Sequence, residues 1–340
     1  MRFRAVGGFF HRHPILLFLL LTPGIPEYLS GSSRVEYLAF FPGGTALFLL
    51  FLGLNLGLYG PGVLLVREAW VRWGRSWGAL LLLGTAYGLL EEGTALSTLF
   101  DPNASVVGGL GHYGRFAGVN WVWLIGVTGV HVVLSVGLPI ALLGLALPET
   151  RGRPLLSRRA LRTAVAVYAI DLLTLMLIAN YWRTAPEWIV GAAVVAGVLW
   201  IAARKLPRGS LDPPLERPAY SPSVCLVLGL AYFPLLLLVP AVGGDARLPA
   251  ALTGALDLLA AGLLFWAVRR GLGRTGNEAQ LTMLALGATL PIAAFGLLAQ
   301  LRLPLVLGVD VLYGLFFYRL WTRYRPEPAA APVPGPDPPS

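Results

Sequence analysis

Two adjacent glutamates, Glu91 and Glu92, stand in the stretch YGLLEEGTALSTLF, whose other residues are typical of a membrane helix. A histidine, His131, stands in a second apolar stretch, NWVWLIGVTGVHVVLSVGLP. Ionisable side chains inside a membrane are costly and usually face the bundle interior or a wet cavity, so they indicate function. Carboxyl and imidazole groups that exchange a proton could serve acid–base catalysis or proton-coupled transport.

The two glutamates are expected to face different neighbours, because consecutive residues of an α-helix project about 100° apart. We predict that one points into a polar chamber and that the other meets a neighbouring helix or a hydrogen-bond donor. His131 has Thr128 and Ser135 on the same helix face, and this polar stripe should look inward. The alternative for each of these side chains is a structural one, in which it is a hydrogen-bonded residue of the core.

Three aspartates, Asp171, Asp257 and Asp310, stand in further apolar stretches. Counted at about 1.5 Å per residue from the predicted outer helix ends, they lie in the outer half of the membrane, as Glu91 and His131 do. This agreement predicts one polar chamber nearer the non-cytoplasmic surface. The glutamates and His131 would carry the chemistry there, and the aspartates would contact the substrate or, alternatively, be satisfied by nearby tyrosines.

The stretch FDPNASVVGGLGHYGRFAGVNW is expected to bring Arg115 and Asn120 over the chamber. Arg115 could bind an anionic substrate or pair with Asp101, and either residue could stabilise a developing oxyanion. The single cysteine, Cys225, excludes a multi-cysteine metal cage, and the other histidines lie in loops or at ends, so a bis-histidine haem is not expected. We predict no metal site, and the sequence leaves any cofactor unknown.

The composition is that of an integral membrane protein. Of the 340 residues, 56% are hydrophobic and only 13% are charged, which is far more apolar than a soluble domain of this length. The formal net charge of +9 could suggest nucleic acid, but the charges are spread between apolar segments rather than gathered on one face. We therefore expect the lipid bilayer as partner, a location in the cell membrane and no nucleic acid.

Apolar stretches long enough to cross a membrane follow one another along the chain. They predict an all-α, polytopic transmembrane helix bundle of about ten spans. The predicted spans run from Pro14 to Leu29, Tyr37 to Val66, Trp77 to Leu99, Val119 to Leu147, Thr163 to Tyr181, Trp188 to Ala203, Val224 to Val242, Pro249 to Val268, Leu281 to Ala299 and Leu303 to Leu320.

Basic residues predict the orientation of these spans. Most of the 26 lysines and arginines fall in alternate loops, which should be cytoplasmic, and both termini lie on that side. The few basic residues on the other side are Arg34, Arg115, Arg183, Arg247 and Arg302. The first span has a basic start, a short core and then Pro23 and Pro26, so the alternative is a cleaved signal peptide that leaves nine spans.

A polar, proline-rich segment at residues 204–223 divides the chain. We predict a six-helix membrane half at 1–203 that carries the polar site, a cytoplasmic linker at 204–223 and a four-helix membrane half at 224–325. The tail at 326–340, PEPAAAPVPGPDPPS, cannot build a core and is expected to be disordered.

The glutamate pair in a membrane helix, followed by a membrane histidine, resembles the CPBP family of intramembrane proteases, which are related to the CAAX-processing enzymes. The resemblance covers Trp77 to Leu147 and implies that the glutamates and His131 activate a water for peptide hydrolysis. Leu96 stands where the family has an arginine, Val127 where it has a phenylalanine, and no later histidine supplies its last motif. Other stretches resemble uncharacterised prokaryotic polytopic membrane proteins.

Three functions fit the sequence. In a proton-coupled transporter of a small solute, which the incomplete protease motifs favour, the glutamates would take up and release protons and the aspartates would relay them or bind the solute. In an intramembrane hydrolase, a glutamate and His131 would activate water to cleave a membrane peptide. In a non-catalytic membrane scaffold, the polar groups would serve only helix packing.

Overall fold

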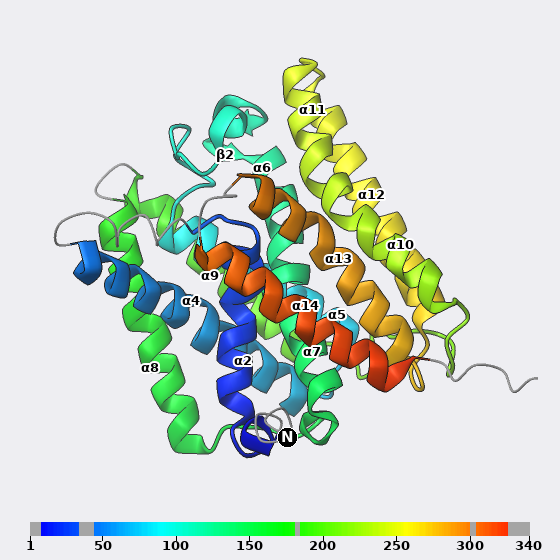
Figure 1. Cartoon of the computed structure of the whole chain (residues 1–340). Helices are drawn as coiled ribbons and strands as arrows, with labels where there is room; N and C mark the ends of the chain where they lie inside the picture. Colours follow the sequence, from blue (N-terminus) through cyan, green and yellow to red (C-terminus); the bar gives the residue numbers. More distant parts are fainter. Residues whose placement is uncertain (1–7, 34–43, 181–183, 300–303, 326–340) are drawn as a thin grey trace, which may run out of the picture.

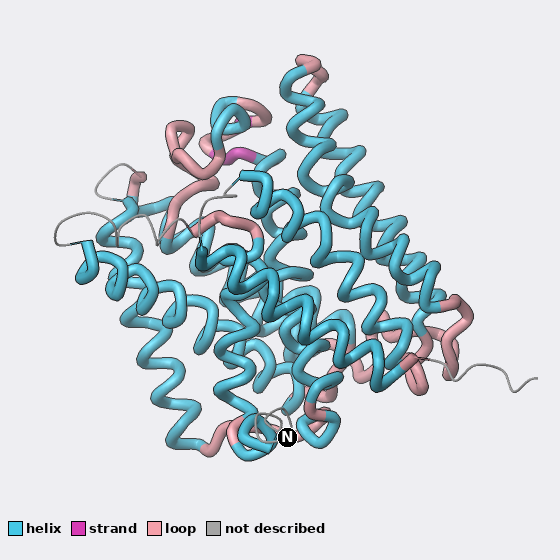
Figure 2. The backbone as a smooth tube through the Cα atoms, viewed as in Figure 1, coloured by secondary structure: helices cyan, strands magenta, loops and turns pink. Residues whose placement is uncertain are grey.

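The chain folds into a bundle of helices in the computed structural model (Figures 1 and 2), which describes residues 8–33, 44–180, 184–299 and 304–325. The only strands in this part are β1 (Arg115–Phe116) and β2 (Val119–Asn120), which pair antiparallel in the loop before α6. The predicted helical class is therefore confirmed for the described residues. The predicted proline-rich tail lies outside them.

Each predicted span coincides with helical residues, some of them in π-helical segments, here labelled η together with the short 3₁₀ turns. The first four spans correspond to α2 (Pro14–Pro23) with η1 (Gly24–Leu29); α4 (Gly44–Arg72); α5 (Trp77–Gly88) with η2 (Leu89–Ala95); and α6 (Trp121–Val130) with η4 (His131–Gly137) and α7 (Leu138–Ala146). The others correspond to α8 (Arg158–Leu175) with η6 (Met176–Asn180); α9 (Pro186–Lys205); α10 (Pro222–Phe233) with η7 (Pro234–Leu238) and α11 (Val239–Asp245); α12 (Ala250–Leu272); α13 (Glu278–Ala299); and α14 (Pro304–Tyr324). The loops carry the 3₁₀ turns η3 (Gly108–His112) and η5 (Pro148–Thr150).

Seven helices in the described part of the chain are long and apolar enough to cross a membrane. The protein is therefore a multi-pass membrane protein, whereas the total of about ten spans and the cytoplasmic termini remain predictions. Serines begin several of the helices: the side chains of Ser76, Ser157 and Ser221 each accept a backbone N–H from the first turn of α5, α8 and α10.

The first apolar segment lies in the core of the bundle. Phe18, Ile25 and Leu29 are fully buried, and α2 packs against α4 and α7. Removal of this segment would leave these partners without their apolar contacts. The first span and the alternative of a cleaved signal peptide both stay predictions.

Glycines bring the later helices close to one another and to the first segment. A Cβ on Gly229 would lie 2.3 Å from the Leu284 carbonyl oxygen, and one on Gly287 would lie 2.3 Å from the Leu226 carbonyl oxygen, so α10 and α13 pack backbone to backbone. At the other end of α13, a Cβ on Gly296 would lie 1.9 Å from the oxygen of Leu29 in η1.

Figure 1 shows α10 and α12 on one flank of the bundle and α4 and α8 on the other, with α14 packed against α13 and η1. The core runs between these flanks and includes residues from α2, α4, α5, α7, α8, α13 and α14. The elements η1, α4, η2 and η4 all contribute residues to this core.

Candidate functional site

Glu91, Glu92 and His131 meet in the interior of the bundle. The Nε2 atom of His131 lies 3.0 Å from Glu92 Oε1, and its Nδ1 atom lies 3.4 Å from Glu91 Oε2 and 3.0 Å from Ser135 Oγ. The exposed fractions are 2% for Glu91, 7% for Glu92 and 3% for His131. One imidazole ring therefore lies between two carboxylates that are almost entirely removed from the surface.

Both glutamates reach the same imidazole, which corrects the expectation that adjacent glutamates would face different neighbours. Both residues lie in the π-helical segment η2, which follows α5 directly, and each approaches a different nitrogen of the ring. The histidine ring also offers a nitrogen on each side. Gly88 lets the ring approach, because a Cβ at this position would lie only 3.1 Å from the Cβ of His131.

Tyr59 of α4 connects this group to a third carboxyl, Glu27 of η1. Its hydroxyl oxygen lies 2.6 Å from Glu91 Oε1 and 2.6 Å from Glu27 Oε1. The other Glu27 oxygen accepts a hydrogen bond from Ser33, whose hydroxyl oxygen in turn accepts one from Asn55 at 2.6 Å. Hydrogen bonds therefore connect Glu27 to Glu91 through Tyr59, and an ion-pair contact between Glu91 and His131 joins them to Glu92.

The far side of Glu92 is also paired. Its Oε2 atom accepts a hydrogen bond from the hydroxyl of Thr98, and this hydroxyl oxygen accepts the indole N–H of Trp123 at 3.0 Å. The expectation that one glutamate meets a hydrogen-bond donor is thus met by both of them, since Tyr59 and Thr98 each contact one. We call the group formed by Glu27, Tyr59, Glu91, Glu92 and His131 the carboxyl–imidazole chain.

Two stacked tyrosines extend from this chain toward Asp171. The ring of Tyr87 lies edge-on to His131, with centroids 5.9 Å apart, and stacks on Tyr168 at 6.3 Å. Asp171 follows Tyr168 on α8 and packs against α4, where a Cβ on Gly57 would lie 2.4 Å from Asp171 Oδ1. The Asp171 Oδ2 atom and both tyrosine hydroxyls are buried with no hydrogen-bond partner in the described part of the protein.

The other two predicted chamber aspartates contact different groups. Asp257 of α12 is fully buried and lies near Gly126 of α6, with its Oδ2 atom 3.7 Å from the position of a Cβ there. Asp310 lies on α14, and its oxygens, like those of Asp257, have no hydrogen-bond partner among the described residues. The structure therefore brings together the glutamates, His131 and, through the tyrosines, Asp171, but not these two.

Arg115 and Asn120 brace the loop between η2 and α6. The Arg115 guanidinium donates to the carbonyl oxygens of Phe100 and Gly118, the latter at 2.9 Å. Asn120 begins α6: its side-chain oxygen accepts the Trp123 N–H at 3.0 Å, and its amide donates to the Leu110 carbonyl at 2.7 Å. Neither side chain contacts the carboxyl–imidazole chain.

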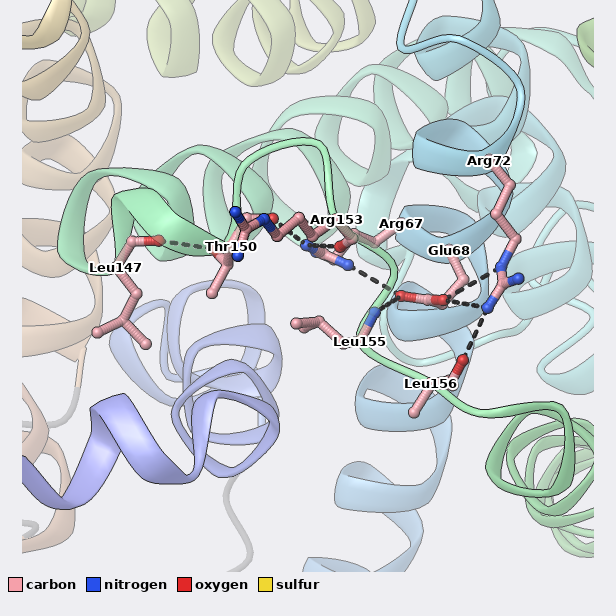
Figure 3. Close-up of polar contacts among 8 residues, drawn as sticks. All are labelled: Arg67, Glu68, Arg72, Leu147, Thr150, Arg153, Leu155 and Leu156. Atoms are coloured by element: carbon pink, nitrogen blue, oxygen red, sulfur yellow. Dashed lines mark hydrogen bonds and ion pairs between the residues drawn. The ribbon is translucent and has the colours of Figure 1, made fainter.

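A second buried ionic group lies at the other end of α4 (Figure 3). Arg67 Nη1 lies 2.9 Å from Glu68 Oε1, and Arg72 Nη2 lies 3.0 Å from Glu68 Oε2. Both arginines also donate to backbone carbonyls of the segment between α7 and α8, those of Thr150, Arg153 and Leu156. Glu68 is 1% exposed, so this group fastens the end of α4 to the following loop.

The sequence reasoning missed Glu27, Tyr59 and Glu68 as members of these clusters. Glu27 and Glu68 stand at the ends of apolar stretches, where a carboxyl is normally expected to be solvated. Tyr59 gave no signal, because a tyrosine in an apolar helix is most often a core residue. A carboxyl next to an apolar run was the one hint available for Glu27 and Glu68.

Proximity alone would let the site hold a metal ion, although the sequence predicted none. Glu91, Glu92 and His131 each offer one ligand atom, and these atoms lie within 4.8 Å of one another. A metal ion takes one nitrogen of an imidazole and draws its other ligands to that side of the ring. Here the two ring nitrogens serve different carboxylates, so the donors fit a protonated imidazole better than a metal ion.

A groove of about 1440 Å³ runs along a different face of the same helices. Leu89, Thr128 and Val132 line its wall, whereas neither glutamate nor His131 does. The groove continues between α9, α10 and α12. The carboxyl–imidazole chain is therefore separated from the groove by the helices that carry it.

Comparison with known proteins places the chain against a family model. A family model described as "Uncharacterized membrane protein family" matches residues 16–320. No curated protein and no solved structure matches the chain. These comparisons do not show the resemblance to the CPBP proteases.

Proposed function

The chain belongs to the uncharacterized membrane protein family whose model matches it, and we propose that it is a proton-coupled transporter of a small solute. In this proposal the carboxyl–imidazole chain binds the coupled proton, with Glu91, His131 and Glu92 at its centre. The support comes from the hydrogen-bond geometry of Tyr59, from the position of His131 and from the apolar layer beneath them.

The contacts of Tyr59 are the observation that carries the proposal. Its hydroxyl lies 2.6 Å from oxygens of both Glu27 and Glu91, yet a phenol has one hydrogen to donate. Two such short contacts are satisfied when Tyr59 donates to one carboxylate and accepts from the other, which must then be a protonated carboxylic acid. This geometry supports a proton shared between Glu27 and Glu91, and such a proton is what a coupled transporter binds and releases.

His131 interacts electrostatically with both glutamates. A protonated imidazole donates to Glu92 from Nε2 and faces Glu91 from Nδ1, so its charge stabilises both carboxylates. Loss of that proton, or arrival of another at Glu91, changes the charge of the whole group without any large movement of side chains. The change in charge would act at short range on a solute that binds near Asp171 or Tyr87.

An apolar layer separates the chain from the ionic group at the other end of α4. Tyr59 and Glu68 are nine residues apart on α4, which corresponds to about 13.5 Å along the helix axis. Val63, Leu64 and Val66 of α4 lie within this interval and are buried, and they belong to the same apolar core cluster as Leu83 and Leu142. Protons cannot cross such a layer without rearrangement of the helices, and this favours coupled, alternating access over an open proton channel.

Hydrolysis of a membrane peptide is the second candidate, and the 3.0 Å contact between Glu92 and His131 favours it, because a glutamate and a histidine together could activate water. Two observations make it the weaker one. The side chains are at most 7% exposed, and the large groove is lined by other residues. A peptide bond would have to reach a site that is closed in this conformation.

The proposal is tested with purified protein in liposomes that contain a trapped pH-sensitive dye. Under an imposed proton gradient, addition of the right member of a panel of small solutes should cause proton movement together with solute uptake. Glu91→Gln should abolish the proton movement, because an amide keeps the contact with Tyr59 but cannot release a proton. Asp257→Asn is the matched control, a buried carboxyl outside the chain, and should retain most of the flux.

Three outcomes would contradict the proposal. Absence of proton-linked flux over the whole panel would remove transport, and equal loss in both variants would remove the special role of Glu91. Cleavage of a membrane peptide that is lost in Glu91→Gln, in the absence of flux, would instead establish the hydrolase. A Glu91→Gln protein that keeps its thermal stability in each assay shows that loss of activity is not loss of fold.

A further inference from the structure

The groove described above has an extent that suits a lipid. Along the continuous helix from α6 to α7, its lining residues run from Trp121 to Gly144, an interval of roughly 35 Å at 1.5 Å per residue. This is close to the hydrocarbon thickness of a bilayer, about 30 Å. Its volume of about 1440 Å³ exceeds the range of ordinary small-molecule pockets.

The walls of the groove are mostly apolar along this length. Leu124 and Val132 line it from α6 and η4, and Leu258 and Phe265 line it from α12. Glycines widen it: Gly262 of α12 lines the groove, and a Cβ there would have nothing within 4 Å. Such walls would accept acyl chains, which need apolar contact but no hydrogen bonds.

One end of the groove is basic. Arg75, Arg151 and Arg274 line it there, while aromatic and aliphatic residues line the opposite end. Arg151 is paired with Glu278 at 2.7 Å, but Arg75 and Arg274 have no ion pair in the described part of the chain. The one carboxylate that lines this end, Asp212, accepts the backbone N–H of Trp77 at 2.8 Å.

Arg75 is also held in place for an anion. Its guanidinium lies over the ring of Trp70, 5.4 Å from the centroid. A phosphate at this end of the groove would offset the positive charge that the arginines lining it carry and would accept hydrogen bonds from guanidinium groups. Basic pockets between membrane helices bind acidic lipid headgroups for the same reason.

We propose that the groove binds an anionic phospholipid, with its phosphate at Arg75 and Arg274 and its acyl chains along the apolar walls toward Trp121. Charge complementarity at one end and apolar walls along the rest select this occupant over a zwitterionic lipid and over a free anion. The site does not include the carboxyl–imidazole chain, so this inference does not depend on proton coupling.

Native mass spectrometry of the full chain tests the proposal, after exchange into micelles that contain equal amounts of phosphatidylglycerol and phosphatidylcholine with the same acyl chains. The protein should retain roughly tenfold or more phosphatidylglycerol than phosphatidylcholine. The double variant Arg75→Gln, Arg274→Gln should lose most of that preference. The matched control removes two exposed arginines at the start of α8, Arg158→Gln with Arg159→Gln, and should keep it.

The groove itself is tested with bulky substitutions. Gly262→Trp fills it and should lower retention of phosphatidylglycerol at least severalfold, whereas Gly197→Trp should not, because Gly197 has equally open surroundings but does not line the groove. Equal retention of the two lipids, or equal behaviour of the two arginine double variants, would overturn the proposal. Loss of bound lipid on addition of inorganic phosphate alone would show a free-anion site, and normal retention by Gly262→Trp would exclude the groove.

Discussion

Replacement of His131 by leucine is the sharpest test of the ionic character of the site. The substitution removes the group that lies 3.0 Å from Glu92 and 3.4 Å from Glu91 and leaves both carboxyls buried. Breaking a buried ion pair by removal of one partner costs about 3–5 kcal/mol. A neutral hydrogen bond within a membrane protein is worth about 0.6 kcal/mol on average and about 1.7 kcal/mol at most. A charged Glu–His–Glu group and a neutral hydrogen-bonded group therefore predict different losses of stability on His131→Leu.

The measurement is reversible unfolding in mixed micelles, followed by circular dichroism, for a thermodynamic cycle. His131→Leu should lower the free energy of unfolding by about 3–5 kcal/mol in the wild-type background. In a background that carries Glu91→Gln and Glu92→Gln, the same change should cost far less, because no carboxylate is left without its counter-charge. The packing contacts that the His131 ring loses are the same in both backgrounds, so they cancel in the difference between the two costs. A cost below about 1.7 kcal/mol that is the same in both backgrounds would refute a charged Glu–His–Glu group.

Gly57→Val should destabilise the protein by about 1–3 kcal/mol, because a Cβ there would lie 2.4 Å from an Asp171 oxygen, whereas Gly53→Ala on the same helix should be nearly neutral since its surroundings are open. Glu68→Leu should lower the free energy of unfolding by about 3–5 kcal/mol in the same assay, since it leaves two arginine partners without their counter-charge. Burial raises the pKa of Glu149, but its backbone hydrogen bond and a paired histidine outweigh this and hold the pKa below its ordinary 4.5. The folding stability that ionised Glu149 contributes is present above pH 4.5 and is lost as the pH falls through the lowered pKa. Because the pair with His11 is exposed, Glu149→Gln should lower the free energy of unfolding by less than about 1 kcal/mol.

Each of these predictions has an outcome that contradicts it. Equal stability of the Gly57→Val and Gly53→Ala proteins would mean that α4 and α8 are not in close contact. A neutral effect of Glu68→Leu would show that the arginines find other partners or are solvated. Titration curves of unfolding that are identical for Glu149→Gln and the unmodified protein would remove the contribution of the His11 pair.

The depth of ionisable residues was readable along each helix, because every residue advances the chain by about 1.5 Å. On that basis Glu91, His131, Asp171, Asp257 and Asp310 formed one predicted layer. Depth says nothing about direction around the helix axis, which packing alone decides. Asp171 turns toward Gly57 and the tyrosines, whereas Asp257 turns toward Gly126. Residues at similar depth thus divide between two locations.

The position of a partner side chain across a helix interface was the second feature that pattern reasoning could not supply. Helix spacing separates Glu91 from Glu92 around the axis, but the His131 ring lies between them and offers one nitrogen to each. Tyr59 was equally invisible, because its role depends on η1 and η2 placing Glu27 and Glu91 on either side of its hydroxyl.

The sequence by itself determined that this is a helical, multi-pass membrane protein and that Glu91, Glu92 and His131 are buried groups in need of partners. These properties follow from composition and from the cost of charge in hydrocarbon, which act on each segment separately. Only the tertiary structure decided which partners meet, because hydrogen bonds are directional and short. A rotation of one helix by a single residue would have paired the same side chains with different neighbours.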